Sequence, residues 1–254
     1  MEPLSVGQFS LVANLMSFTI AAMGASALYF FLSREIVAPR YRSALVLSGL
    51  VVAIAAYHYF RIAESWNAAY TLDNGVYVAS GAGFNDAYRY ADWLLTVPLL
   101  VIELVLVLGL SKEETRSLSL RLGGAAALMV ALGYPGEVAA GTGTRLFFWA
   151  AAMLPFLYIL RVLYTEFSGA IDRQAENVRG LVGNARTVLL VTWSFYPLAY
   201  LGPELGLSGS SAETFVQVGY TIADVTAKAG FGLLICAIAK AKSADYQAEL
   251  FEGA

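Results

Sequence analysis

Five charged residues lie within two long apolar stretches of the sequence. Lys228 is near the middle of residues 217–239, and Asp224 precedes it by one helical turn. Arg89, Asp92 and Glu103 lie in the stretch RYADWLLTVPLLVIEL. Because a charge at the centre of a bilayer costs about 2.5–3.5 kcal/mol on the insertion scale, such residues indicate a functional site. An amine buried beside carboxylates could hold a charged chromophore or pass a proton.

The spacing of these residues places them on two helix faces. At about 100° per residue, Asp92 and Thr96 are neighbours, and Glu103 returns to nearly the same face about 16 Å further along the axis. Arg89 lies almost one turn before Asp92, and the lysine and aspartate of the other stretch share a face at i, i+4. Structural ion pairs between two helices are the alternative, but Glu103 has no basic residue near its own depth.

The composition indicates a membrane protein. Hydrophobic residues make up 58% of the 254 residues and charged residues 14%, whereas soluble domains average about 25% charged residues. The sequence has no linker that would divide it, so we expect a single domain over residues 1–254. Neither the net charge of −3 nor any basic tract suggests a nucleic-acid partner. One cysteine and one histidine make a metal site improbable.

Seven segments are long enough to cross a bilayer, which needs about 20 apolar residues each. The predicted fold is therefore an all-α membrane protein, a seven-transmembrane helix bundle. The loop between the second and third spans contains Asp73-Asn74-Gly75 between two short β-prone runs, which predicts a short β-hairpin. The predicted spans are residues 9–32, 43–62, 86–110, 120–138, 146–164, 187–201 and 215–239.

Positive charges gather at one end of these spans. By the positive-inside rule that end is cytoplasmic, which places the N-terminus outside the cell membrane and the C-terminus inside. The twelve basic residues at this end, of sixteen in the chain, are Arg34, Arg40, Arg42, Lys112, Arg116, Arg121, Arg161, Arg173, Arg179, Arg186, Lys240 and Lys242.

Five motifs along nearly the whole chain resemble those of the microbial rhodopsins, most closely the xanthorhodopsin-like and proteorhodopsin-like proton pumps. They are AYHYFRI, RYADWLLTVPLL, GYPGE, WSFYPLAYL and GYTIADVTAKAGFGLL. Any one motif alone is a weak signal, whereas the combination is highly specific.

The resemblance implies a role for each charged residue. Lys228 matches the lysine that binds all-trans retinal as a protonated Schiff base. Asp92 matches the primary counterion and proton acceptor, and Asp224 the second counterion. Glu103 matches the cytoplasmic proton donor, which we expect to be protonated at rest. Arg89 matches the arginine that couples the counterions to the release side.

The resemblance also implies a retinal pocket. Four aromatic and proline residues of the sixth span share one helix face even without it, a pattern for which core packing is the alternative. The residues that match positions lining the pocket are Trp93, Thr96, Met129, Gly133, Trp149, Trp193, Tyr196 and Pro197.

His58 is the only histidine in the chain. Taken alone, it would be explained by an ordinary hydrogen-bonded position in the core. The motif AYHYFRI resembles the family segment whose histidine pairs with the counterion, so the resemblance implies a pair between His58 and Asp92.

The implied function is a light-driven outward proton pump, which is an ion transporter and not an enzyme. Sodium pumps of the family carry other residues at positions 92, 96 and 103, and chloride pumps lack the carboxylate at position 92. The remaining alternative is a photosensory rhodopsin that signals through a partner protein.

The group that releases the proton to the outside is a separate question. Glu204 is a candidate for it, and the alternative for Glu204 is an exposed loop residue without a role. Glu137 and Asp86 are further candidates.

Two expectations concern partners and a second pigment. The resemblance implies a homo-oligomer, a trimer or a pentamer, in the lipid bilayer. Some xanthorhodopsin-like pumps bind a carotenoid antenna in an opening created by a glycine of the fifth span. Aligning TRLFFWAAAMLPF with that span places Trp149 at the glycine position, so we expect no carotenoid antenna.

Overall fold

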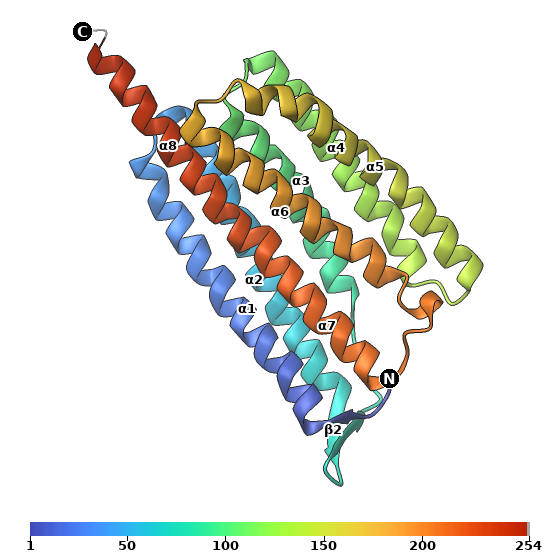
Figure 1. Ribbon diagram of the computed structural model, residues 1–254. Coiled ribbons are helices and arrows are strands. Elements are labelled where there is room, and N and C mark those ends of the chain that lie inside the picture. Colours follow the sequence, from blue (N-terminus) through green and yellow to red (C-terminus); the bar gives the residue numbers. More distant parts are fainter. Residues whose placement is uncertain (253–254) are drawn as a thin grey trace.

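Seven helical spans form an elongated bundle in the computed structural model, which describes residues 1–252 and their side chains as far as Tyr246 (Figure 1). The seventh span is interrupted by a π-helical turn, η4, between α7 and α8. The predicted seven-helix fold is therefore confirmed. The helices are α1 Val6–Ser33, α2 Arg42–Ala69, α3 Ala87–Leu108, α4 Lys112–Glu137, α5 Thr142–Asp172, α6 Glu176–Tyr200, α7 Gly209–Val225, η4 Thr226–Gly230 and α8 Phe231–Glu252.

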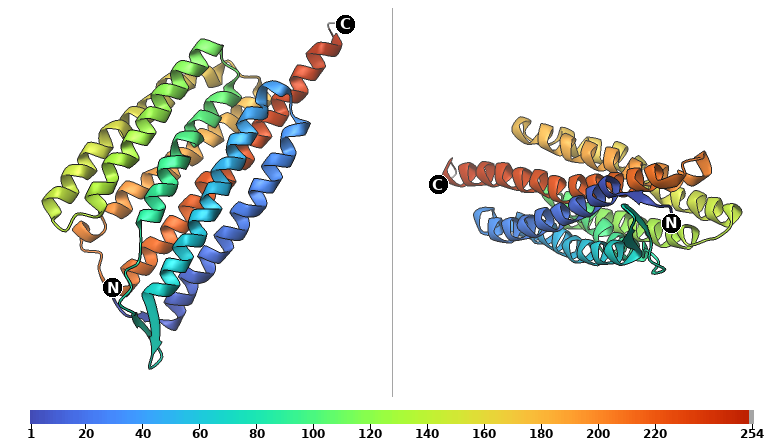
Figure 2. Two further views of the ribbon diagram at one scale, coloured as in Figure 1. Left: turned by 180° about the vertical axis from the view of Figure 1, so that it is seen from behind. Right: turned by 90° about the horizontal axis from the view of Figure 1, so that it is seen from below.

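Consecutive helices pack side by side from α1 to α5, and the last span closes the bundle. α8 contacts α2, α3 and α6, while α7 contacts α1 and α6. The N-terminus and the β-hairpin lie at one end of the molecule and the C-terminus at the other (Figures 1 and 2). The central position of the last span places its lysine within reach of α2 and α3.

Six of the seven spans are longer than the apolar segments that predicted them, and α3 is slightly shorter. Their ends continue into polar residues, where capping signals define the boundaries. Ser111 and Glu114 form a capping box that begins α4, and Gly109, with φ 69°, ends α3 in the left-handed conformation. The short 3₁₀ turns Arg34–Ile36, Pro39–Tyr41 and Pro203–Leu205 lie in the connections.

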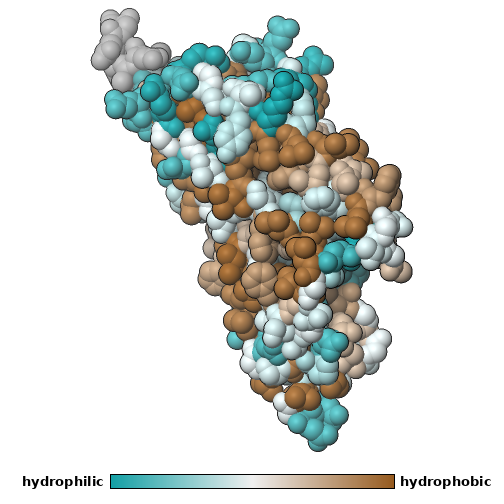
Figure 3. Space-filling model, turned by 45° about the vertical axis from the view of Figure 1, so that its right-hand side comes forward, coloured by the Kyte–Doolittle hydropathy of each residue, from teal (hydrophilic) through white to brown (hydrophobic). Residues whose placement is uncertain are grey.

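The outer surface matches the environment expected of a bilayer. In the described part of the chain, six spans are long and apolar enough to cross a membrane by composition, and α6 is the exception because polar residues and glycine dilute it. A broad hydrophobic region covers the middle of the molecule and polar residues gather at its ends (Figure 3). Large side chains exposed to the surroundings include Leu28, Phe147 and Leu154. These faces fit contact with lipid.

The predicted hairpin is present and is joined by a third strand. β2 Tyr70–Asp73 pairs with β3 Val76–Ala79 through a turn in which Asn74 and Gly75 have φ of 45° and 84°. Both angles are those of a type I′ turn, which explains the Asn-Gly sequence. β1 Leu4–Ser5, which was not predicted, pairs with the other edge of β3.

Candidate functional site

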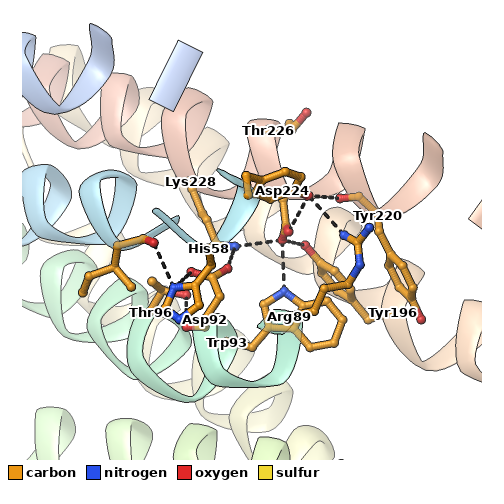
Figure 4. Close-up of polar contacts among 12 residues, drawn as sticks. His58, Arg89, Asp92, Trp93, Thr96, Tyr196, Tyr220, Asp224, Thr226 and Lys228 are labelled. Carbon is orange, nitrogen blue, oxygen red and sulfur yellow. Dashed lines mark hydrogen bonds and ion pairs between the residues drawn. The ribbon is translucent and has the colours of Figure 1, made fainter. Parts of the chain in front are cut away.

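Lys228 lies in the π-helical turn and reaches the centre of the bundle. Its Nζ is 2.5 Å from Asp92 Oδ2 and 2.9 Å from Asp224 Oδ1, and all three side chains are buried (Figure 4). A π-helical turn widens the helix locally, and such turns are frequent at functional sites. The structure thus brings together the amine and the two carboxylates that the sequence singled out.

The two carboxylates differ in the number of other donors that they accept. Asp224 accepts hydrogen bonds from the hydroxyls of Tyr59 at 2.8 Å and Tyr196 at 2.7 Å, and from Trp93 Nε1 at 3.2 Å. Asp92 Oδ1 has no hydrogen-bond partner among the described residues. The charge on Asp224 is therefore stabilised by three neutral donors besides the amine, while Asp92 depends on the amine.

His58 and Thr96 lie beside Asp92 but bond to backbone carbonyls. His58 Nδ1 is 2.9 Å from the carbonyl oxygen of Ile54 and 4.0 Å from Asp92 Oδ1. The Thr96 hydroxyl donates to the carbonyl oxygen of Asp92 at 2.8 Å. Both side chains are in position to act on Asp92, and their roles stay predictions.

Arg89 is buried on the side of this cluster toward the β-hairpin and contacts the cluster through a tyrosine. Its guanidinium donates to the Tyr59 hydroxyl at 3.4 Å and to Gln217 Oε1, and its Nε lies 3.8 Å from Asp86. The ring of Tyr220 lies under the guanidinium, 5.2 Å away. The positive charges of the lysine and Arg89 balance the negative charges of the two aspartates, as burial of ions requires.

Glu103 is fully buried on α3, toward the opposite end of the bundle. Its Oε2 accepts a 2.7 Å hydrogen bond from the Ser48 hydroxyl of α2, and its Oε1 has no partner among the described residues. No cation accompanies it in the salt bridges of the described chain. An ionised carboxylate is costly in such surroundings, which favour the neutral acid.

An aromatic-lined cavity extends from Lys228 between α3, α4, α5 and α6. Of the eight residues predicted to line a retinal pocket, seven line this cavity. Thr96, which bonds to the α3 backbone instead, is not one of its lining residues. The seven predicted lining residues are Trp93, Met129, Gly133, Trp149, Trp193, Tyr196 and Pro197; those that the sequence did not assign include Tyr90, Leu100, Phe156 and Tyr220.

The sequence reasoning missed two hydroxyl partners on α2. Ser48 and Tyr59 are eleven residues apart, the same separation as Asp92 and Glu103 on the antiparallel helix α3. Eleven residues return to nearly the same helix face. The two hydroxyl residues of α2 therefore have the same spacing along their helix as the two carboxylates of α3 have along theirs. This shared separation of eleven residues is the sequence signal that could have identified Ser48 and Tyr59.

Two of the candidate release residues form a group with Arg145 at the end of the bundle that carries the β-hairpin. Arg145 lies 4.0 Å from Glu204 and 3.7 Å from Glu137, and the Tyr90 hydroxyl is 3.5 Å from Glu137. Asp86 lies apart from them, next to Arg89.

A seven-helix membrane bundle with a buried lysine between two carboxylates, beside an aromatic cavity, defines the rhodopsin class of membrane proteins. The family model for bacteriorhodopsin-like protein matches residues 10–242, and the chain belongs to this family. The resemblance to microbial rhodopsins is thereby confirmed.

Individual relatives agree over nearly the whole chain. The crystal structure of xanthorhodopsin, described as a light-driven ion pump with dual chromophore, is 53% identical with a TM-score of 0.94, covering 97% of this chain and 99% of that one. Thermophilic rhodopsin is 50% identical with a TM-score of 0.93 and the same coverage. The green-light absorbing proteorhodopsin of Gamma-proteobacterium EBAC31A08 is 30% identical over 229 residues, 89% of this chain and 85% of that protein.

Proposed function

We propose that this protein is a light-driven outward proton pump that carries all-trans retinal on Lys228. Its relatives among the proteorhodopsins and xanthorhodopsin support the reaction class. The observation that carries the assignment to this chain is the position of the Lys228 amine, 2.5 Å from a carboxylate that lacks other donors.

The residues around the amine fit the cofactor that the family uses. Lys228 Nζ lies at the wall of an apolar cavity lined by aromatic side chains, which suits a long conjugated hydrocarbon. Trp93, Trp193, Tyr196 and Pro197 would hold the chain of the cofactor. When bound, retinal supplies light absorption and an isomerisation that changes the surroundings of the proton on Nζ.

Asp92 is the acceptor of that proton. Its Oδ2 is the carboxylate oxygen nearest to Nζ, and its Oδ1 has no hydrogen-bond donor to stabilise the anion. Asp224 keeps its charge because three other donors hold it, so it serves as the fixed counterion. A proton that leaves Nζ is thus directed to one carboxylate of the two.

Glu103 returns a proton to Nζ from the other end of the bundle. Because it is buried without a cation, it holds its proton until Nζ has lost its own. Ser48 orients one of its oxygens. Eleven residues separate Glu103 from Asp92 on α3, about 16 Å along the axis, so donor and acceptor act on opposite sides of the lysine.

The direction of transport follows from the sidedness of the charges. The end of the bundle nearer Glu103 carries the basic loops, which the positive-inside rule assigns to the cytoplasm. The end nearer Asp92 carries the N-terminus and the hairpin (Figure 1). Proton movement from Glu103 toward Asp92 is then outward across the cell membrane.

The proposal includes the oligomeric state that the family resemblance implies. The working unit is a homo-oligomer, a trimer or a pentamer.

Illumination of cells that produce the protein with retinal tests this proposal. We expect the external medium to become more acidic in light and a protonophore to abolish the change. Alkalinisation in light would contradict outward transport. A bound pigment that moves no protons would favour the photosensory alternative.

A further inference from the structure

A chain of polar contacts continues outward from the candidate site beyond Asp224. Asp224 accepts from the Tyr59 hydroxyl, and that hydroxyl accepts from Arg89. The guanidinium of Arg89 also donates to Gln217 Oε1. The Gln217 amide nitrogen in turn donates to Glu213 Oε1 at 3.0 Å.

Glu213 is the outer end of this chain. It lies one helical turn before Gln217 on α7, and it is partly exposed whereas Gln217 is buried. Burial, together with the nearby charge of Glu213, raises the pKa of Tyr70 in the hairpin to about 12. The carboxyl therefore lies near Tyr70, at the end of the bundle that carries the hairpin.

Among the groups beyond Asp224 in this series of contacts, Glu213 is the first carboxyl. A tyrosine hydroxyl and an arginine guanidinium keep their protons at neutral pH, while a glutamine amide does not titrate. Glu204 and Glu137, by contrast, are ion-paired with Arg145. Asp86 lies 3.8 Å from Arg89 Nε, which makes it the competing exit.

We propose that Glu213 is the carboxyl through which pumped protons leave the protein, and that Gln217 is a positioning residue that connects it to Arg89. The inference rests on the proposed pumping function and adds its outer terminus. Gln217 suits this position because its amide both accepts from the guanidinium and donates to the carboxylate.

The test follows proton release after a light flash in the retinal-bound protein in lipid nanodiscs. A pH-indicator dye reports the proton in bulk water, and the infrared carbonyl band of Asp92 reports its protonation. In Glu213→Gln we expect Asp92 to be protonated at the normal rate and release to be delayed about tenfold, equivalent to about 1.4 kcal/mol of barrier. Gln217→Leu should give the same delay with Glu213 intact.

Glu64→Gln is the matched control, since Glu64 is an exposed carboxylate of α2 at the same end that pairs with Arg61 at 3.2 Å. Its release time should equal that of the unmodified protein. An unchanged release time in Glu213→Gln would overturn the inference, as would an equal delay in the control or a delay confined to Asp86→Asn. Absence of release from the unmodified protein would instead overturn the proposed function and this inference with it.

Glu213 is partly exposed, so Glu213→Gln tests the proposal even where the buried Gln217→Leu fails to assemble a pigment. The visible absorption of each variant reports its folding independently of proton release. Gln217→Glu provides a second check, because a carboxylate at that position keeps a hydrogen-bond acceptor for Arg89. We expect it to retain the normal timing of Asp92 protonation and to alter only the release.

Discussion

At the residue scale, the two aspartates beside Lys228 are chemically unlike although they lie at similar distances from it. Tyr59, Tyr196 and Trp93 donate to Asp224, and no described side chain except the lysine donates to Asp92. Since hydrogen bonds to a charged group contribute about 1.5–3 kcal/mol each, this difference is large enough to decide which carboxylate takes a proton.

Removal of the amine tests the attachment of retinal. Lys228→Ala should yield a folded protein that gains no visible absorption with retinal, because no other lysine lies in the cavity among its described lining residues. Absorption spectra after addition of retinal provide the measurement. Borohydride trapping of a visible pigment on another residue would contradict the assignment.

Substitution of the two carboxylates of α3, Asp92 and Glu103, should affect colour and transport differently. Asp92→Asn removes the negative charge 2.5 Å from Nζ, so absorption should shift to the red and pumping should stop. Glu103 lies far from Nζ, so Glu103→Gln should leave the colour nearly constant. The late steps of the photocycle should slow about tenfold or more in this variant. Flash photolysis at neutral pH distinguishes them, and unchanged late kinetics in Glu103→Gln would exclude the donor role.

The sequence predicted the charged members of the site because their positions in apolar segments are unusual. It did not predict Ser48 or Tyr59, whose types are unremarkable and whose importance arises from contacts with Glu103 of α3 and Asp224 of α7. It also could not predict that His58 would approach a backbone carbonyl more closely than Asp92, since this depends on the rotamer.

At the scale of elements, hydropathy located all seven spans but underestimated the lengths of all except α3. α6 begins at Glu176 and α5 ends at Asp172, both in polar sequence beyond the apolar segments. Helices continue past the hydrocarbon region until a cap ends them, which hydropathy does not detect. β1 was missed because two residues have no periodicity, and only the edge of β3 makes them a strand.

Close packing of the last span against α1 depends on a glycine. A Cβ at Gly232 would lie 2.6 Å from two ring atoms of Phe30, a fully buried side chain. Overpacking of this kind costs about 1–3 kcal/mol. Gly232→Ala should therefore lower the temperature at which the pigment bleaches.

Gly124→Ala is the matched control for this substitution. A Cβ at Gly124 would meet nothing within 4 Å, and alanine favours the helix more than glycine does. The bleaching temperature should stay constant or rise slightly. An equal loss of thermal stability in both variants would contradict the packing explanation.

At the scale of the whole molecule, the bundle has two different ends on either side of a hydrophobic belt. The charge pattern and the position of the termini distinguish the two ends. The basic loops and the C-terminus occupy one end, and the hairpin and the N-terminus the other (Figure 2). The sequence predicted this arrangement because an odd number of spans places the termini at opposite ends. It could not predict how the helices enclose a cavity, which depends on side chains from at least four of them.

One tryptophan on α5 closes the wall of the cavity toward α6. Trp149 of α5 lines the cavity and donates from Nε1 to the carbonyl oxygen of Pro197 in α6 at 3.0 Å. The indole therefore bridges the two helices, at the position that the sequence predicts to match the glycine beside the carotenoid opening of some xanthorhodopsin-like pumps. A tryptophan side chain buries about 150–250 Å², enough to fill such an opening.

We expect a hydroxylated carotenoid to transfer no energy to retinal in the unmodified protein, because the indole occupies the contact surface. Trp149→Gly should open it and add carotenoid bands to the excitation spectrum. Phe147→Gly, which removes an exposed aromatic side chain from the same helix, should leave the spectrum without them. Carotenoid bands in the unmodified protein would show that the tryptophan does not block the site, and bands in both glycine variants would place the carotenoid elsewhere on α5.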